Sequence, residues 1–486
     1  MPFNSPDFQP SARARVAAGS VLQIVSRVAV LGCGVVLIGY LTRRLGTAEY
    51  GRYAVSVVLM NWLAITMAVA TGGATVRLMA GKENGRRYAV SMLQMVGVLA
   101  ATLAVLIALA AQPLADLLRS PAIAPLLRIL SADFAMGAVA GIYSGILVAQ
   151  GRYGLSALTA LTAMAAQLLA AFFFVEQGLL AAGACWAVVA GSVVQLVIGR
   201  WASGIPFFSC ERVPFGDLWG HTRLLAGAQL ALRMTQSMDL LAVKFFGLSP
   251  SLAGLYAGGQ NIGQAGFMMF GPTQAVLLQS MAQSRRDGNH DEAARTGTLY
   301  LRVALTYGAL LCALSVLADE IAVFLLGPAF ARSGPILAIL LWAVAFRLLA
   351  GTGRTLISAV GEKVSIMIPL LVLIVLGIIA YAIAIPRGGI IAAAAVALGL
   401  AIAAGLTSLR EGLKIMGLRF PWISLFKIFA AAVVTAFVAA SLPGTGWFLI
   451  AKLTVSCLLY AALLFAFNEW RPTRQQLISL RQALAR

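Results

Sequence analysis

The sequence predicts an all-α integral membrane protein with about fourteen transmembrane helices. Of its 486 residues, 60% are hydrophobic and 11% are charged, whereas soluble domains carry roughly 25% charged residues. Apolar stretches of about 20 residues recur along the whole chain, and each would cross the ~30 Å hydrocarbon layer as one helix. Segments such as 390–406 are apolar on every side, whereas strands of a transmembrane β-barrel alternate apolar and polar residues. We therefore expect a bundle of membrane-spanning helices.

The apolar stretches define fourteen predicted spans. The first follows Arg13 and Arg15 as a secretory signal would, but it continues without a small-residue cleavage site, so we expect it to be retained. After the last span, leucines at helical spacing among arginines are typical of an amphipathic helix on a membrane surface. The predicted spans are residues 16–42, 50–75, 88–112, 125–149, 154–175, 179–200, 222–246, 252–280, 297–318, 334–359, 364–385, 389–409, 424–441 and 446–467.

The distribution of Lys and Arg sets the orientation of these spans. The alternate set of connections that includes both termini carries 24 basic residues, and the other set carries 9. Because positive charge accumulates in short cytoplasmic loops, both termini are predicted to be cytoplasmic, in a multi-pass protein of the bacterial inner membrane. The net charge of +19 is then a topology signal, and no nucleic-acid partner is expected because the charge is not concentrated on one soluble face.

Two short motifs recur about 200 residues apart. A glycine, a short polar loop and Gly-x-Tyr-Ala occupy residues 46–54 and again 247–257, and the Gly-x-Tyr-Ala part recurs at an offset of 203 residues. Ala-x-Gly at 149–151 returns at 359–361, at an offset of 210 residues. Both motifs pair a span with the sixth span after it, which preserves orientation and indicates a parallel repeat. We therefore expect two pseudo-symmetric six-helix lobes (1–210 and 211–415), two additional spans (416–467) and a cytoplasmic amphipathic tail (468–486).

These motifs resemble those of the polysaccharide-repeat flippases. This family comprises the Wzx-like O-antigen and exopolysaccharide translocases of the MOP superfamily, which also includes MATE drug exporters and MurJ-type lipid II flippases. The resemblance covers most of the first twelve spans and implies a transporter built from two facing lobes. The residues that carry it are Arg44, Leu45 and Gly46 with Gly51, Arg52, Tyr53 and Ala54, Asp239 ahead of the second copy, and Leu326, Gly327, Pro328 and Phe330 before span ten.

Three arginines lie near the middle of predicted spans, where a charge costs several kcal/mol unless it faces protein or water. Arg27 shares one helical face with Gln23 in span one, and Arg233 shares one with Gln229 and Gln236 in span seven. Because these spans correspond in the two lobes, we expect both faces to line a central cavity. The further substrate-binding candidates are Arg347 in span ten, Asn61 in span two, and Gln260, Asn261 and Gln264 in span eight.

A cationic cavity lined by amides suits a diphosphate-linked or acidic glycan. Arginine binds phosphate or carboxylate bidentately, and amides can bond sugar hydroxyls. A cavity that binds cationic drugs would instead need negatively charged residues. The alternative for each arginine is an ion pair with a carboxylate on a neighbouring helix, for which Asp133 in span four and Asp239 in span seven are available.

Asp133 and Asp239 could instead take up a proton or coordinate sodium, so that an ion gradient drives transport. No other cofactor is expected. The five cysteines are far apart and have no companion histidine spacing, which gives no indication of a disulfide framework or a metal site. Candidate hinges are Gly72 and Gly73 in span two and Gly271 and Pro272 in span eight, although glycine and proline are also frequent in membrane helices generally.

The leading functional hypothesis is a flippase that moves an undecaprenyl-diphosphate-linked oligosaccharide across the inner membrane by alternating access. The alternatives are a MATE-like drug or cation exporter, a lipid II flippase, or a membrane-embedded polymerase, ligase or glycosyltransferase. An enzyme is disfavoured because the external connections are short and the two histidines, His221 and His290, are predicted to be cytoplasmic. No paired carboxylates or nucleophile motif is found either. Expected partners are the lipid-linked glycan, the bilayer, and a polymerase or other polysaccharide-assembly membrane proteins.

Overall fold

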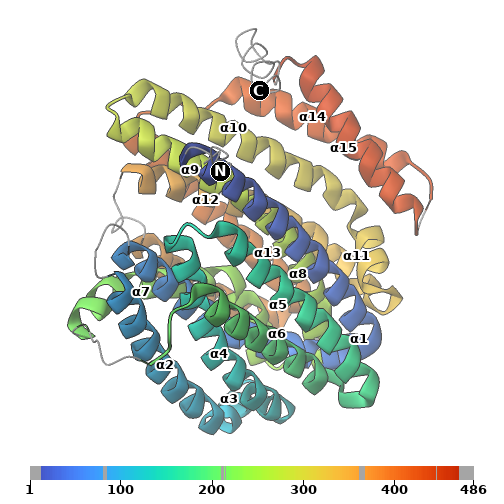
Figure 1. Cartoon of the computed structure of the whole chain (residues 1–486). Helices are drawn as coiled ribbons and strands as arrows, with labels where there is room; N and C mark the ends of the chain where they lie inside the picture. The colour runs from blue at the N-terminus through green and yellow to red at the C-terminus, as the bar shows by residue number, and fades with distance from the viewer. Residues whose placement is uncertain are drawn as a thin grey trace, which may run out of the picture. The chain divides into compact units, whose positions relative to one another are not determined.

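The computed structural model describes residues 12–79, 85–208, 213, 215–360, 367–444 and 446–469, and no β-strand occurs within them. Figure 1 traces the helices along the chain. Their bounds are α1 Ala12–Met79, α2 Gly85–Leu109, α3 Ala111–Leu117, α4 Ala124–Ala149, α5 Tyr153–Phe174, α6 Leu180–Ser203, α7 Phe215–Phe245, α8 Pro250–Met269, α9 Gly271–Arg286, α10 His290–Leu314, α11 Ala318–Leu326, α12 Gly334–Val360, α13 Met367–Met416, α14 Trp422–Ser441 and α15 Phe448–Ala466.

Nine helical segments in the described part of the chain are long and apolar enough to cross a membrane. Three of them span 55, 51 and 49 residues, more than twice the ~20 residues that one crossing needs. Each of the three contains a glycine with a positive φ, namely Gly46 (68°), Gly178 (84°) and Gly389 (58°). Glycine adopts this conformation without steric cost, so each long segment consists of two helices joined by a kink. The prediction of an all-α, multi-pass membrane protein is confirmed, whereas the count of fourteen spans and the pseudo-symmetry stay predictions.

The chain forms two compact units that differ from the predicted lobes. Unit 1 comprises Met1–Gly258 and Leu370–Ala393, and unit 2 comprises Gly259–Pro369 and Ala394–Arg486. Two helices, α8 and α13, therefore change unit along their length. The lobes expected from the internal repeat stay a prediction, and packing groups the chain differently because the start of α8 packs on α1. The predicted amphipathic tail, apart from Asn468 and Glu469, lies outside the described residues.

Small residues let helices of unit 1 approach closely. A Cβ added to Gly145 on α4 would lie 2.7 Å from the carbonyl oxygen of Gly72 on α1, and one added to Gly141 would lie 2.8 Å from the Cβ of Ala68. Such small-residue crossings are common where membrane helices pack without a hydrophobic driving force between them. The pair holds the second half of α1 against α4.

A second glycine crossing in unit 1 joins the two copies of the repeated motif. A Cβ on Gly51 would lie 2.0 Å from the carbonyl oxygen of Pro250, and a Cβ on Gly254 would lie 1.9 Å from that of Thr47. The glycines that open the two motifs, Gly46 and Gly247, both have a positive φ, at 68° and 79°. The two copies of the motif therefore share a backbone conformation at their first glycine and contact each other at their second.

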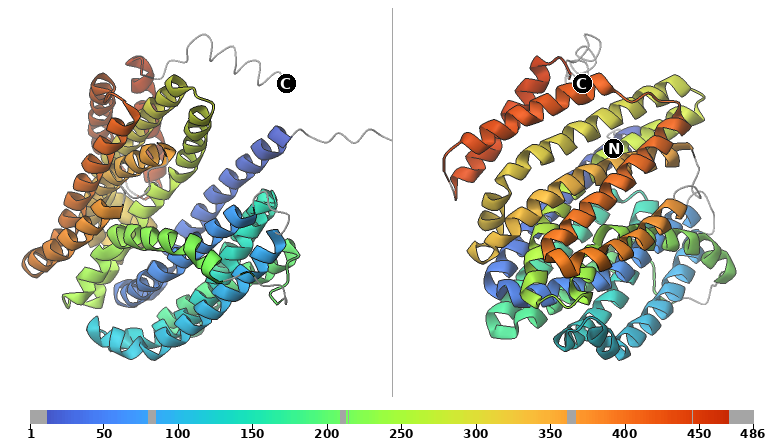
Figure 2. Two further views of the ribbon diagram at one scale, coloured as in Figure 1. Left: turned by 90° about the vertical axis from the view of Figure 1, so that its left-hand side faces the viewer. Right: turned by 180° about the vertical axis from the view of Figure 1, so that it is seen from behind.

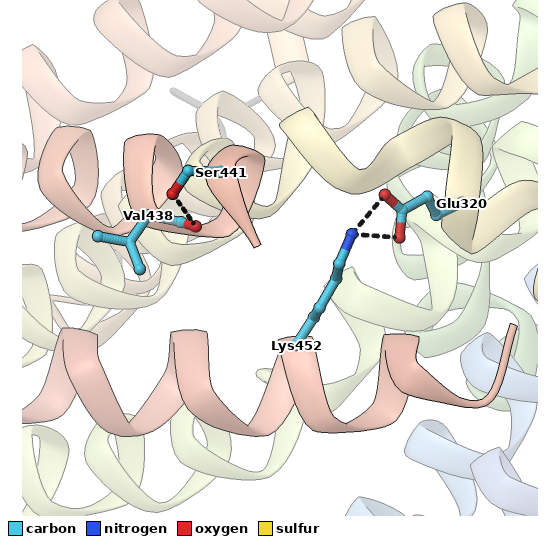
Figure 3. Close-up of polar contacts among 4 residues, drawn as sticks. All are labelled: Glu320, Val438, Ser441 and Lys452. Atoms are coloured by element: carbon cyan, nitrogen blue, oxygen red, sulfur yellow. Dashed lines mark hydrogen bonds and ion pairs between the residues drawn. The ribbon is translucent and has the colours of Figure 1, made fainter. Parts of the chain in front are cut away.

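In unit 2, aromatic packing and ion pairs hold the helices together. Phe270, between α8 and α9, stacks on both Tyr300 and Tyr307 of α10, with ring centroids 5.8 and 5.7 Å apart. The helices α14 and α15 run side by side (Figure 2). Lys452 on α15 donates to both carboxylate oxygens of Glu320 on α11, at 2.8 and 3.0 Å (Figure 3).

A second ion pair fixes the other end of α15. Arg302 on α10 donates from Nε to the carboxylate of Glu469, just after α15, at 2.8 Å. Between the two ion pairs, the Tyr460 hydroxyl donates to the carbonyl oxygen of Thr306 on α10 at 2.9 Å. These contacts attach α15 and the residues just after it to the rest of unit 2.

Candidate functional site

Polar side chains of α1 and α7 meet within unit 1. The indole Nε1 of Trp62 on α1 donates to the Ser237 hydroxyl on α7 at 2.7 Å, and that hydroxyl donates to the carbonyl oxygen of Arg233 at 3.0 Å. Trp62, in the second half of α1, is therefore bonded to α7 at Ser237, which lies one helical turn after Arg233. Asn61, next to Trp62 in the sequence, is half-buried.

Arg233 has unsatisfied hydrogen-bonding capacity in this place. Its Nε is buried and has no hydrogen-bond partner, and its guanidinium forms no ion pair with any residue that the structure describes. Gln229 and Gln236, one turn to either side on the same face of α7, are half-buried. A buried donor without a partner costs about 1–3 kcal/mol, and more when it is charged. An anionic group bound here would remove that cost.

Arg27 lies in the first half of α1, before the kink at Gly46, and its side chain is exposed. Its side chain forms no hydrogen bond or ion pair with the described part of unit 1, so the alternative of an ion pair with an aspartate is not found there for Arg27. The side chain of Gln23 lies outside the described residues, although its backbone belongs to α1. The meeting of the Arg27 and Arg233 faces in one cavity stays a prediction.

Asp133 on α4 is buried beside a hydroxyl group. Its side chain is 9% exposed, and its Oδ1 accepts a hydrogen bond from Ser192 Oγ on α6 at 2.5 Å. Tyr53 of the repeated motif and Cys185 lie close enough to Asp133 for electrostatic interaction. Within the described part of the chain, Asp133 forms no ion pair.

Asp239 on α7 is 1% exposed and is joined to the second copy of the motif. Its Oδ2 accepts a hydrogen bond from the Tyr256 hydroxyl on α8 at 2.9 Å. Tyr53 and Tyr256 occupy the same position of the repeated motif, so each motif tyrosine lies near a buried aspartate. The role of either aspartate in ion coupling stays a prediction.

The remaining substrate-binding candidates belong to unit 2. Arg347 lies on α12 and is half-buried, Gln260 on α8 is 8% exposed, and Asn261 and Gln264 on α8 are half-buried. Their contribution to a cavity shared with Arg233 stays a prediction. The structure also places Arg354 two turns beyond Arg347, close enough to the buried Tyr300 for electrostatic interaction. Sequence reasoning assigned Arg354 to a cytoplasmic connection and did not single it out.

The candidate hinges differ in local structure. The helix breaks at Phe270, between the end of α8 and the start of α9, next to Gly271 and Pro272. By contrast, α1 is helical through Gly72 and Gly73, since its only non-helical residue is Gly46. Gly72 is needed for close packing on α4 instead. Bending at either place stays a prediction.

Chemically, the described residues offer anion and hydroxyl recognition. No group of three potential metal ligands occurs among the described residues. Arg233 can donate to an anion, and the flanking amides can donate to or accept from hydroxyl groups. The long apolar helices define the class, a multi-pass membrane protein, and the half-buried polar residues around Arg233 form a candidate site on α1 and α7.

Solved structures with the same fold are membrane transporters. The lipid II flippase MurJ in an inward closed conformation superimposes with a TM-score of 0.77 at 16% identity, over 93% of this chain and 99% of that chain. A multidrug resistance MATE family transporter of the MOP superfamily, inward-facing, gives 0.62 at 14% identity, over 84% and 98%. A MOP superfamily transporter from Pyrococcus furiosus gives 0.60 at 13% identity, over 83% and 95%. The fold is therefore that of MOP superfamily transporters.

The sequence also matches one protein family. The family described as polysaccharide biosynthesis protein matches residues 40–335, which is more than half of the chain. No curated protein sequence matches the chain. The chain belongs to the polysaccharide biosynthesis protein family, as its repeated motifs predicted.

Proposed function

We propose that this protein is a flippase that moves an undecaprenyl-diphosphate-linked oligosaccharide repeat unit from the cytoplasmic to the periplasmic leaflet by alternating access. The observation that carries the proposal is Arg233. It is a half-buried arginine on α7, with an unpaired Nε and an amide one turn to either side. A diphosphate would supply the missing acceptor, and the amides would meet sugar hydroxyls.

Membership of a polysaccharide biosynthesis family supports a glycan cargo. The protein would act in the bacterial inner membrane with both termini cytoplasmic, alongside a polymerase and other assembly proteins. The charged head group would pass through the polar interior while the polyprenyl tail stays in lipid.

A lipid II flippase is the second candidate. The similarity to MurJ favours it, because that superposition covers more of this chain than the superpositions with MATE transporters. Lipid II and the oligosaccharide carrier share a polyprenyl diphosphate, so Arg233 fits both cargoes. The two candidates differ in the sugar part of the cargo, which the test below varies.

The drive for transport would come from a proton or sodium gradient that acts on a buried carboxylate. Asp133 suits a proton because its hydrogen-bond partner is a neutral hydroxyl. Proton binding and release at this carboxyl group would be coupled to exposure of the site.

The experiment follows the leaflet accessibility of lipid-linked oligosaccharide and of lipid II in inverted vesicles. It compares the wild type with Arg233→Gln, Arg27→Gln and the matched control Arg128→Gln, an exposed arginine on α4. We expect the wild type and the control to move the oligosaccharide carrier, and Arg233→Gln to be at least tenfold slower, as for loss of about 1.4 kcal/mol.

Two results would contradict the proposal. If the wild type moves lipid II and not the oligosaccharide carrier, the second candidate replaces the first. If Arg233→Gln transports the oligosaccharide as fast as Arg128→Gln, the arginine does not bind the diphosphate. Equal amounts of each variant in the membrane, measured by immunoblot, exclude a difference in expression.

A further inference from the structure

Residues of α2, α4 and α6 in unit 1 line a groove. The helices α2 and α6 both pack against α4, and Figure 1 labels all three. Its volume is about 710 Å³. The wall is apolar, and α4 and α6 supply most of it through Ala135, Met136, Val139, Leu196 and Val197. None of these side chains belongs to the polar site on α1 and α7.

Two polar side chains converge in this groove. Tyr143 on α4 is 1% exposed, and its buried hydroxyl has no hydrogen-bond partner in the part of the chain that the structure describes. Tyr143 and Arg200 on α6 are close enough to interact electrostatically. Gly199 makes this approach possible, because a Cβ there would lie 3.0 Å from the Cβ of Tyr143.

Arg200 lies where a lipid head group would be expected. It is exposed, in the last turn of α6, and its side chain makes no hydrogen bond or ion pair with a described residue. The next residue, Trp201, is 81% exposed, as is Phe208 after the helix. Exposed aromatic rings at the end of a membrane helix mark the level of the head groups. By the distribution of basic residues, this end of α6 faces the cytoplasm.

We propose that this groove is a binding site for an anionic phospholipid of the cytoplasmic leaflet. The lipid phosphate would accept hydrogen bonds from the Arg200 guanidinium and the Tyr143 hydroxyl, which supplies the partner that the buried hydroxyl lacks. One acyl chain would lie along the apolar wall of α4 and α6. Basic pockets between membrane helices on the cytoplasmic side are typical sites for anionic head groups.

The occupant is a bulk phospholipid rather than the cargo, because the groove and the candidate transport site use different helices. The apolar wall would contact the acyl chains of any phospholipid and does not discriminate between lipids. Selection comes from Arg200, whose charge favours a lipid with net negative charge over a zwitterionic one. The described groove contains no carboxylate that would neutralise Arg200.

The test measures lipid retained by the purified full-length protein after exchange into mixed micelles that contain equal phosphatidylglycerol and phosphatidylcholine. Native mass spectrometry counts each bound lipid. The variants are Arg200→Gln, Arg200→Lys and Tyr143→Phe, with Arg410→Gln as the control for an exposed arginine on α13. We expect the preference for phosphatidylglycerol to fall about fivefold in Arg200→Gln, as for loss of one basic residue near the head groups.

We expect Tyr143→Phe to weaken retention as well, whereas Arg200→Lys and the Arg410→Gln control retain the wild-type preference. Equal preference in the wild type and Arg200→Gln would overturn the proposal. So would an equal loss in Arg410→Gln, because the preference would then reflect overall surface charge. If a polyprenyl diphosphate at equal concentration displaces the bound phosphatidylglycerol, the groove binds the cargo instead. Because the readout is binding, the result does not depend on which cargo is transported.

Discussion

The crossing of Gly51 and Gly254 makes a steric prediction. In Gly254→Ala, the new methyl group would lie 1.9 Å from the Thr47 carbonyl oxygen, and in Gly51→Ala it would lie 2.0 Å from that of Pro250. Real Cβ atoms keep at least about 3.0 Å from such atoms, so the two segments must separate by about 1 Å. Both obstructing atoms are backbone atoms, so no side chain can rotate to make room. Overpacking of this kind costs about 1–3 kcal/mol.

The assay is thermal unfolding of the purified protein in one detergent, followed by tryptophan fluorescence. We expect each alanine variant to unfold roughly 2–10 °C below the wild type. In the double variant, the separation that accommodates one methyl group partly accommodates the other, so the combined loss should be smaller than the sum. The control is Gly73→Ala, where an added Cβ meets no atom within 4 Å.

Alanine at position 73 should be neutral or slightly stabilising, since alanine is the better helix former by about 1 kcal/mol. The steric reasoning is refuted if Gly254→Ala and Gly73→Ala unfold at the same temperature. Strict additivity of the double variant would mean that the two methyl groups do not share one crossing.

Two further perturbations concern buried charges. Lys452→Met should lower the free energy of unfolding by about 1–3 kcal/mol, because Glu320 loses both hydrogen bonds. Chemical unfolding measures this loss. The added substitution Glu320→Gln should recover part of the lost stability, and no recovery would mean that the two residues are not coupled. Asp133→Asn should fold normally, because the amide oxygen can still accept a hydrogen bond from Ser192 Oγ. Transport by this variant in vesicles should no longer respond to an imposed proton gradient. If transport still depends on the gradient as in the wild type, Asp133 is not the coupling group.

The positions of the helices could be predicted because hydropathy alone marks the membrane-embedded length. The span predicted at 125–149 is α4, Ala124–Ala149, and the span predicted at 424–441 is α14, Trp422–Ser441. The connections were less predictable. A loop expected between spans one and two is instead a single kink at Gly46, because one glycine with a positive φ changes the helix direction without intervening residues.

The candidate site was predicted in part. Arg233 stood out because a charge in the middle of a span needs an explanation, and the structure leaves its Nε without a partner. Arg200 did not stand out, because it was counted among the basic residues of a predicted cytoplasmic loop and its charge needed no further explanation there. The partner of Asp133 was also unpredictable, because Ser192 is 59 residues away in the sequence and a serine in a membrane helix carries no distinctive signal.

The division of α8 and α13 between the two units affects how the protein is made. Unit 1 requires Leu370–Ala393, which the ribosome synthesises only after the intervening Gly259–Pro369. At about 5–20 residues per second, those 111 residues delay completion of unit 1 by roughly 6–22 s. During that interval the nascent unit sits in the membrane without one of its helices, so lipid or the insertion machinery must cover the vacant face. A chain truncated before residue 370 would remain in that unfinished state permanently.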